Sequence, residues 1–401
     1  MPDSVFVTGV GIISAIGSDV ESVWNSLREG RTGIGPMKLI DSAYKGELPV
    51  AEIHASNKEL LGTALPRVKN YYSRTALLGM IAARQAIAQS GAEAGSLENA
   101  GLISATTVGG MDRTEIFYKG FMSDKSSGRI REAAGHDCGD STEKIADNLG
   151  IGGYLSTINT ACSSSANAIM LGARMIRQGK LKMAITGGVD CLTKFTINGF
   201  NSLMILDKEQ CRPFDENRNG LNLGEGAAYL VLESEEEVRR TGKKVLCEIS
   251  GYGNACDAYH QTASSPEGHG ALLSMKQALE TAGLAPSDIS YINTHGTGTK
   301  NNDLSEGVAI ERLFQDAVPP CSSTKSFTGH TLGAAGALEA VLSVLALRHN
   351  CIYQNLNFSV QMHELHFTPV TGFQMVQGLN HIMSNSFGFG GNNSSLIFSK
   401  H

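Results

Sequence analysis

Short apolar runs typical of strands alternate along the chain with longer segments whose apolar residues recur at helical spacing. The first run, residues 5–13, is apolar apart from two glycines and one threonine, which predicts a buried strand. Residues 74–89 follow Ser73, repeat apolar residues at helical spacing and stop before Gly91, as expected of a helix. This alternation predicts an α/β protein.

The same reading places the remaining strands and helices. We expect further strands at residues 101–107, 154–158, 182–190, 226–233, 245–253 and 289–293, and a hairpin of strands at 381–398. We expect further helices at residues 168–177, 233–244, 270–283 and 331–349. Residues 111–147 are polar and mixed, so a mobile or partner-facing cap is expected there.

The order of elements near the N-terminus recurs in the second part of the chain. A strand with late glycines, a helix stopped by glycine and a further strand open both parts, although few identities survive between them. We therefore predict two βα-rich halves, residues 1–244 and residues 245–401. Ligands of such α/β sheets gather where strands end and loops converge, so the key turns should face each other.

Composition narrows the class of protein. At 401 residues with 41% hydrophobic residues and 46 glycines, the chain is typical of a soluble α/β enzyme larger than one ordinary core. A net charge of −6 argues against a general nucleic-acid binder. Eight cysteines without paired spacing indicate reduced thiols in the cytoplasm. The N-terminus has neither a basic region nor a long apolar core, so we expect no secretion and no membrane insertion.

Cys162 lies between a predicted strand at residues 154–158 and a predicted helix at residues 168–177. A thiol at such a turn is near unpaired backbone N–H groups and the positive end of the helix dipole, which lower its pKa. The alternative is a buried cysteine that only packs, as most cysteines do. This stretch alone does not separate the two interpretations.

Three further clusters follow predicted strands or precede predicted helices. His295 directly follows a strand, Lys325 and His330 precede a helix, and residues 384–393 form a glycine-rich strand end. Each cluster by itself has an ordinary structural explanation, although a lysine in an apolar, glycine-rich setting is rarely a solvated surface group. Together with Cys162, they predict a thiol nucleophile with two donors over a developing anion.

These motifs resemble those of the β-ketoacyl-[acyl-carrier-protein] synthases, the condensing enzymes of fatty acid and polyketide synthesis. The similar segments are Thr160-Ala161-Cys162-Ser163, Thr294-His295-Gly296-Thr297, Lys325-Ser326-Phe327-Thr328-Gly329-His330 and Asn385-Ser386-Phe387-Gly388-Phe389-Gly390-Gly391. The resemblance covers nearly the whole chain and is closer to the elongating Cys-His-His class than to thiolases or initiating synthases. It implies a thiolase-like fold, with two pseudo-repeated βα halves in a layered α-β-α-β-α arrangement.

The resemblance implies a ping-pong condensation that lengthens a fatty acid or polyketide chain by two carbons. Cys162 would take the acyl chain from the phosphopantetheine arm of its carrier protein, with the backbone N–H groups of Cys162 and Phe389 as the oxyanion hole. Malonyl carrier would then lose carbon dioxide, and His295 and His330 would hold the enolate oxygen. Catalysis would require no cofactor beyond the phosphopantetheine that arrives on the carrier.

Other positions take their expected roles from the same resemblance. Lys325 would fix His330 electrostatically, Glu306 matches the acidic partner of that lysine region, and Phe389 matches a gating phenylalanine. Substrate contacts are expected from Val108, Phe200, Thr297, Thr299 and Phe387. A structural cation, sodium or potassium, is expected at Asn293, Glu339, Ser384 and Asn385. Oxygen ligands of this kind suit a hard cation.

The expected partner is an acidic acyl carrier protein. Arg67 and Lys69 are the expected docking residues, because complementary charge accelerates encounter. The family implies a homodimer, and a heterodimer with a related subunit is the alternative.

Two classes of function remain open at this point. The first is an active elongating synthase, serving either fatty acid synthesis or a polyketide or aryl polyene pathway. The second is a non-catalytic partner of the chain-length-factor type, which lacks the nucleophile that this chain keeps as Cys162. Asn392 stands where threonine is common in the elongating enzymes, which leaves room for a specialised branch. The sequence does not determine acyl chain length, unsaturation or pathway.

Overall fold

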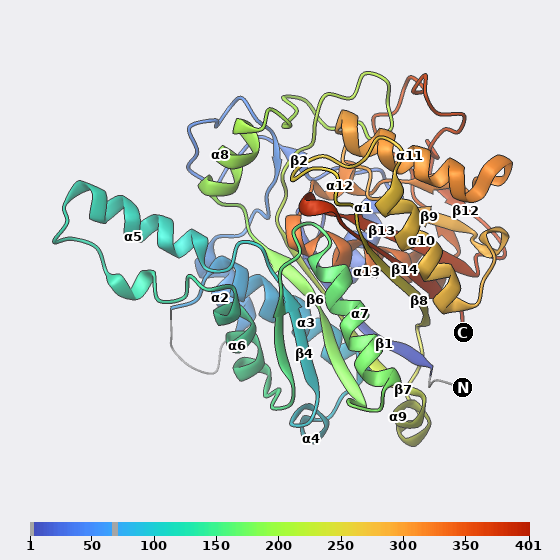
Figure 1. Cartoon of the computed structure of the whole chain (residues 1–401). Coiled ribbons are helices and arrows are strands. Elements are labelled where there is room, and N and C mark those ends of the chain that lie inside the picture. The colour runs from blue at the N-terminus through green and yellow to red at the C-terminus, as the bar shows by residue number, and fades with distance from the viewer. Residues whose placement is uncertain (1–3, 66–70) are drawn as a thin grey trace.

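The computed structural model describes residues 4–65 and 71–401. A large mixed sheet runs through this part of the protein (Figure 1). Its strands are β1 (Val5–Ser14), β4 (Gly101–Ala105), β5 (Leu155–Ile158), β6 (Met183–Asp190), β7 (Gly226–Ser234), β8 (Cys247–Cys256), β9 (Tyr291–Asn293), β10 (Cys321–Ser322), β13 (His381–Phe387) and β14 (Asn392–Ser399). Two short ladders pair β2 (Ile34–Gly35) with β3 (Val50–Ala51) and β11 (Cys351–Ile352) with β12 (Gln374–Met375).

The large sheet consists of two halves with the same topology. The strand order is β10-β9-β13-β14-β8 in one half, continued by β1-β7-β6-β4-β5 in the other. In the first half, β7 lies antiparallel between β1 and β6, and β4 lies parallel between β6 and β5. In the second half, β14 lies antiparallel between β8 and β13, and β9 lies parallel between β13 and β10. The five strands of each half are thus arranged in the same way. The halves meet where β1 pairs with β8. This topology confirms the predicted repeat.

Helices complete a five-layer arrangement. The α-helices are α1 (Val20–Arg28), α2 (Asn57–Ala64), α3 (Arg74–Ser90), α4 (Ala94–Leu97), α5 (Met111–Ser123), α6 (Cys138–Leu149), α7 (Ser164–Arg177), α8 (Lys194–Ser202), α9 (Glu235–Thr241), α10 (His269–Ala282), α11 (Lys300–Phe314), α12 (Lys325–Thr328) and α13 (Ala335–His349). α7 and α13 pack between the two half-sheets, α3 covers the outer face of the first, and α10 covers the outer face of the second.

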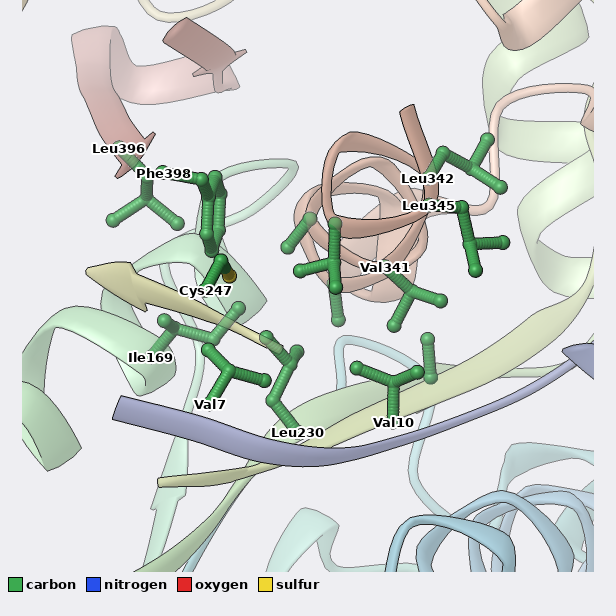
Figure 2. Packing of buried hydrophobic residues seen from close by; sticks show 14 of the residues in the cluster. Val7, Val10, Ile169, Leu230, Cys247, Val341, Leu342, Leu345, Leu396 and Phe398 are labelled. Atoms are coloured by element: carbon green, nitrogen blue, oxygen red, sulfur yellow. The ribbon is translucent and has the colours of Figure 1, made fainter. Parts of the chain in front are cut away.

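The central layer holds an apolar core shared by both halves. Figure 2 shows side chains of β1, β7, β8 and β14 beside Ile169 of α7 and Val341 of α13, all members of one buried apolar cluster. The stretch Leu332–His349 is long and apolar enough to span a membrane, but 89% of it is buried inside the protein. Its apolar character on every face is therefore that of a core helix.

Glycines in the first strand of each half allow helices to pack directly on the sheet. A Cβ at Gly9 would lie 2.1 Å from the Ala86 carbonyl oxygen of α3. In the second half, a Cβ at Gly253 would lie 2.1 Å from the Ser274 carbonyl oxygen of α10. The late glycines recognised in both predicted strands thus have the same physical cause, which is close approach of a backbone.

Most predicted boundaries agree with the structure to within three residues, and the larger differences are at two helix starts. α7 begins at Ser164 rather than at residue 168, and α13 begins at Ala335 rather than at residue 331, because a short 3-10 helix, Leu332–Ala334, precedes it. Smaller shifts have local reasons. β7 continues to Ser234, whose side chain then caps α9, so the helix expected from residue 233 begins at Glu235. The predicted boundary after residue 244 lies in the link between α9 and β8.

The expected cap at residues 111–147 is two different structures. No residue of α5 is buried, and the helix extends away from the body in Figure 1. α6 instead packs against α3 through buried Ile145 and Ala146, so it belongs to the outer helix layer.

Replacing a central-layer leucine should destabilise the protein strongly. Leu230 is fully buried in the shared core, so Leu230→Ala should lower the free energy of unfolding by about 2–5 kcal/mol through lost burial and a residual cavity. Leu273 on α10 is 50% exposed, and Leu273→Ala should change the free energy of unfolding by about 0.5 kcal/mol or less. Chemical denaturation of both variants tests this, and similar losses would contradict the assigned core.

Candidate active site

Cys162 lies in a tight turn between β5 and α7, as the sequence predicts. Ala161, just before it, has a φ of 53°, a left-handed conformation that is uncommon for a residue other than glycine. The Ser164 hydroxyl stabilises this turn, because it accepts a hydrogen bond from Thr160 N and donates one to the Ala161 carbonyl. The thiol is only 6% exposed and faces a cavity of about 420 Å³.

Burial, rather than the helix terminus, dominates the acidity of this thiol. Desolvation raises the pKa of Cys162 to about 11, and the nearby Asp190 carboxylate adds to the rise. The backbone N–H groups of Phe389 and Cys162 and the Lys325 ammonium lower the pKa, but not enough to offset burial. The expectation of a lowered pKa is therefore wrong for the substrate-free protein. The thiol needs a neighbouring base.

Two histidines face the thiol from the second half of the chain. His330 Nε2 lies 3.1 Å from Cys162 Sγ, within hydrogen-bonding reach. The rings of His295 and His330 are nearly perpendicular, with centroids 5.4 Å apart. The sulfur and one nitrogen of each ring lie within 4.8 Å of one another. The structure thus brings together three side chains that are far apart in sequence.

Lys325 determines which nitrogen of His295 carries the proton. Its buried ammonium lies 3.2 Å from His295 Nδ1, donates to the His295 carbonyl and forms an ion pair with Glu339. Because an ammonium group only donates, Nδ1 accepts and the ring proton lies on Nε2, toward the cavity. Burial, with Lys325 nearby, holds the pKa of both His295 and His330 well below the usual value, so both rings are neutral.

These contacts correct one expected role and extend another. Lys325 does act on His330 through its charge, which helps to lower the pKa of that ring, but its hydrogen bonds are made elsewhere. Lys325 forms its hydrogen bonds with His295 rather than with His330 in the part of the chain that the structure describes, and its acidic partner is Glu339 rather than Glu306. Glu306 instead accepts hydrogen bonds from the backbone N–H groups of His295 and Gly296, at 2.9 and 2.8 Å. Burial raises the pKa of Glu306 to about 7. Its position makes it a support for the His295 loop.

Most of the predicted substrate contacts line the cavity. Thr297, Thr299 and Phe387 lie on its wall, and the rings of Phe200 and Phe389 stack with centroids 5.9 Å apart. These aromatic rings come from opposite halves and line the same cavity as the thiol.

Val108 does not line this cavity, so the expectation that it contacts substrate is wrong. It is buried in the apolar cluster on the α3 side of the sheet, and its backbone N–H donates to Asp190. Its neighbours in sequence, Thr106 and Thr107, bond the same carboxylate, which holds the whole segment in place.

Asp190 is a functional support that the sequence analysis did not identify. At the end of β6, its carboxylate accepts bonds from the Thr106 and Thr107 hydroxyls and from Gly333 N, three residues after His330. One buried acid therefore ties the ends of β4 and β6 to the histidine segment. A polar residue ending an otherwise apolar strand was the only signal in the sequence.

The expected cation ligands are only partly brought together. Asn293 and Ser384 are paired across β9 and β13, and Asn293 Nδ2 donates to the Glu339 carbonyl. The buried Ser384 hydroxyl has no hydrogen-bond partner among the described residues, which fits an oxygen ligand. The Asn385 side chain donates to Glu306 through Nδ2 and accepts from the Ser395 hydroxyl at Oδ1.

Cys162, His295 and His330 could also be considered as a metal site, because each offers one ligand atom. A metal would need a lone pair on His295 Nε2, but the ammonium at Nδ1 keeps the proton on that nitrogen. The arrangement is better suited to acid–base work around a thiol. The expected docking residues Arg67 and Lys69 lie outside the described residues.

Solved structures share this architecture over the whole chain, and curated relatives share its sequence over nearly the whole chain. The ishigamide ketosynthase/chain length factor matches with a TM-score of 0.94 and 31% identity, covering 100% of both chains. The ketosynthase ApeO in complex with its chain length factor ApeC from Xenorhabdus doucetiae matches with a TM-score of 0.85 and 33% identity, covering 100% of this chain and 98% of that one. The 3-oxoacyl-[acyl-carrier-protein] synthase 2 of Staphylococcus aureus (strain COL) is 34% identical, covering 99% of this chain and 98% of the relative.

Two family models cover the chain in succession. The N-terminal domain of beta-ketoacyl synthase matches residues 3–238, and the C-terminal domain matches residues 246–359. With the repeated topology and the Cys162 site at the junction of the two halves, these matches establish that the chain belongs to the beta-ketoacyl synthase family.

Proposed function

We propose that this protein is a β-ketoacyl-[acyl-carrier-protein] synthase that lengthens a carrier-bound acyl chain by two carbons, through decarboxylative condensation with malonyl carrier protein. The observation that carries the proposal is the buried cluster of Cys162, His330 and His295, with 3.1 Å between the thiol and the first ring. The name of the Staphylococcus aureus relative supports the same reaction.

In the first stage, Cys162 Sγ attacks the carbonyl carbon of the acyl thioester on phosphopantetheine. The carbonyl oxygen becomes an oxyanion that accepts hydrogen bonds from the backbone N–H groups of Cys162 and Phe389. The bond to the carrier sulfur then breaks, and the thiol proton passes through His330 Nε2 to the departing thiolate. Burial keeps His330 neutral, which leaves its ring able to accept that proton.

In the second stage, malonyl carrier loses its carboxylate as carbon dioxide. The electron pair of the broken carbon–carbon bond forms an enolate, whose oxygen accepts hydrogen bonds from Nε2 of His295 and His330. His330 accepts the thiol proton in the tautomer with its own proton on Nδ1, and it donates to the enolate in the tautomer with that proton on Nε2. Both tautomers are open to it, because His330 Nδ1 has no hydrogen-bond partner among the described residues. The enolate carbon attacks the acyl-Cys162 carbonyl, the carbon–sulfur bond breaks, and the thiolate regains a proton from solvent through His330. Lys325 supports this stage because it keeps the His295 proton on Nε2.

The synthase is proposed to act on acidic acyl carrier protein, with Arg67 and Lys69 as docking residues, in the cytoplasm.

A second candidate function is a synthase of a polyketide or aryl polyene pathway that is paired with a chain length factor. Full-length similarity to two structures that contain a ketosynthase and a chain length factor favours this candidate.

Dimerisation is proposed on the basis of the edge strand β5, because its first residue, Leu155, and the preceding Tyr154 are exposed. Light scattering of the chain, alone and after co-expression with a related subunit, distinguishes a homodimer from a heterodimer. A monomer under both conditions would contradict the proposal.

A structural sodium or potassium ion is proposed near Asn293, Glu339 and Ser384. The unpartnered Ser384 hydroxyl supports it. Thermal unfolding in potassium, sodium and tetramethylammonium salts tests the proposal. Identical melting temperatures in all three would contradict it.

Removing the nucleophile should abolish acyl transfer without unfolding the protein. Cys162→Ala removes the attacking sulfur and leaves a small side chain in the turn. Intact mass after incubation with acyl carrier protein should show an acyl adduct on the wild type and none on this variant. Cys321→Ala, which removes an equally buried thiol from β10, is the matched control and should still be acylated. An adduct on Cys162→Ala would refute the assignment.

Blocking the thiol should separate the two half-reactions. Cys162→Gln places an amide where the acyl-enzyme lies, so malonyl carrier should still release carbon dioxide while no condensation product forms. Adding His295→Ala should lower this release by about 100-fold or more, because one of the enolate donors is lost. Carbon dioxide release is the measurement. Unchanged release in the double variant would remove His295 from the enolate site.

The rate at which Cys162 is alkylated should keep rising with pH up to unusually alkaline values. A thiol with a pKa of about 11 gains thiolate with each step toward that pH, so the iodoacetamide rate should rise about tenfold per unit through pH 9–10. Lys325→Met removes a positive charge that lowers this pKa, so it should slow alkylation at fixed pH. Free N-acetylcysteine is the control and should level off near its ordinary pKa. A plateau of the Cys162 rate below pH 9 would contradict the burial argument.

A further inference from the structure

Three side chains converge on one oxygen behind the nucleophile turn. Asn392 Oδ1 accepts hydrogen bonds from the Ser163 hydroxyl, from Asn167 Nδ2 and from Asn254 Nδ2, each at 2.8 Å. Ser163 directly follows Cys162 in sequence, and Asn167 lies in the first turn of α7. Asn254 is on β8 and Asn392 is the first residue of β14, so the cluster joins the two halves of the protein.

The same cluster fixes the shape of the nucleophile turn. Asn167 Nδ2 donates to the Thr160 hydroxyl at 2.8 Å. The Ser163 hydroxyl has a single proton, which it shares between the Thr160 carbonyl and Asn392 Oδ1, both at 2.8 Å. On its other side, Asn167 Oδ1 accepts from the Ser394 hydroxyl at 2.8 Å and from Asn254 at 3.1 Å. The orientation of each carboxamide is therefore set by its neighbours.

Asn392 also follows directly after the segment that carries Phe389. The Gly388 N–H donates to the Asn392 carbonyl at 2.9 Å, which closes a short loop around Phe389. Gly390 and Gly391 have φ angles of 78° and 79°, a region in which glycine moves with little steric cost. Such a loop does not by itself hold a backbone N–H at a fixed point.

The two backbone donors at the Cys162 sulfur come from segments that are not joined by sequence. One belongs to Cys162 itself and the other to Phe389. Gly388 packs against the nucleophile turn so closely that a Cβ there would lie 3.0 Å from the Thr160 carbonyl oxygen. The hydrogen bond between Ser163 and Asn392 therefore connects the two donor segments. Ser163 directly follows Cys162, and Asn392 lies three residues after Phe389.

We propose that Asn392 is a positioning residue for the reaction, whose carboxamide oxygen sets the separation of the two oxyanion-hole N–H groups. The role rests on the proposed function, because the oxyanion hole matters only for acyl transfer to Cys162. Asn392 acts through Ser163 and the Phe389 loop and does not touch the reacting atoms. Its effect is specific to the acyl half-reaction, since the enolate oxygen is held by the two histidines.

Three variants test the proposal. Asn392→Leu has a similar size but no acceptor, Asn392→Asp keeps the acceptor and adds a negative charge, and Ser163→Ala removes one donor in a small, conservative change. The matched control is Ser274→Ala, which removes a buried hydrogen bond from α10 to Ser395, another residue of β14. Each variant is compared with the wild type for single-turnover acyl transfer from acyl carrier protein and, in the Cys162→Gln background, for malonyl decarboxylation.

We expect Asn392→Leu to slow acyl transfer by about 10- to 100-fold while decarboxylation stays within about threefold, because small displacements of an oxyanion donor are costly. Ser163→Ala should show the same split with a smaller loss, which keeps the test decisive if Asn392→Leu does not fold. Asn392→Asp should restore acyl transfer to within about tenfold of wild type at its own optimum, shifted to higher pH by the added charge. Ser274→Ala should change neither half-reaction.

Equal losses in both half-reactions, or unchanged acyl transfer in Asn392→Leu and Ser163→Ala, would overturn the positioning role. Alkylation of Cys162 by iodoacetamide distinguishes this failure from failure of the proposed function, because it needs no carrier substrate. If the Phe389 N–H is displaced from the sulfur, alkylation at fixed pH should slow in Asn392→Leu, whether or not the wild type condenses acyl groups. A wild type that accepts no acyl group would instead refute the proposed reaction.

Discussion

The direct contact between the N-terminal ends of α7 and α13 is the constraint on which the site depends. The Ser165 hydroxyl of α7 accepts a hydrogen bond from Ala337 N of α13 at 2.8 Å. A Cβ at Gly336 would lie 2.9 Å from the Ala166 backbone nitrogen, so a side chain there would push the helices apart. Because the nucleophile precedes one helix and His330 precedes the other, this contact sets the distance between thiol and base.

Burial gives the site its electrostatic character. Desolvation keeps the thiol protonated and both histidines neutral, so none of these three side chains carries a charge until a reaction creates it. The Lys325–Glu339 pair is the fixed charge nearest His295, and it forms before any substrate enters. Such a site is preorganised for anions that form and disappear during a reaction cycle.

Polar side chains, rather than the apolar core alone, align the two halves around the cavity. Asp190 ties two strand ends of the first half to Gly333 in the second, and Asn392 ties the second half to the nucleophile turn. The apolar core between the half-sheets supplies the stability, but it does not specify the position of individual donors. The two kinds of interaction therefore divide the work between holding the fold and aligning the chemistry.

The sequence by itself determined most strands, the long helices that cover them, their repeat and the four segments that carry the chemistry, because hydrophobic periodicity, glycine stops and motifs are local properties of the chain. It did not predict α1, α2, α8, α11 or β10. Only the tertiary structure decided the partners: Glu339 rather than Glu306 for Lys325, the place of Val108 outside the cavity, and the raised pKa of Cys162. Hydrogen-bond partners and desolvation depend on residues that are distant in sequence and become neighbours only when the half-sheets pack around α7 and α13.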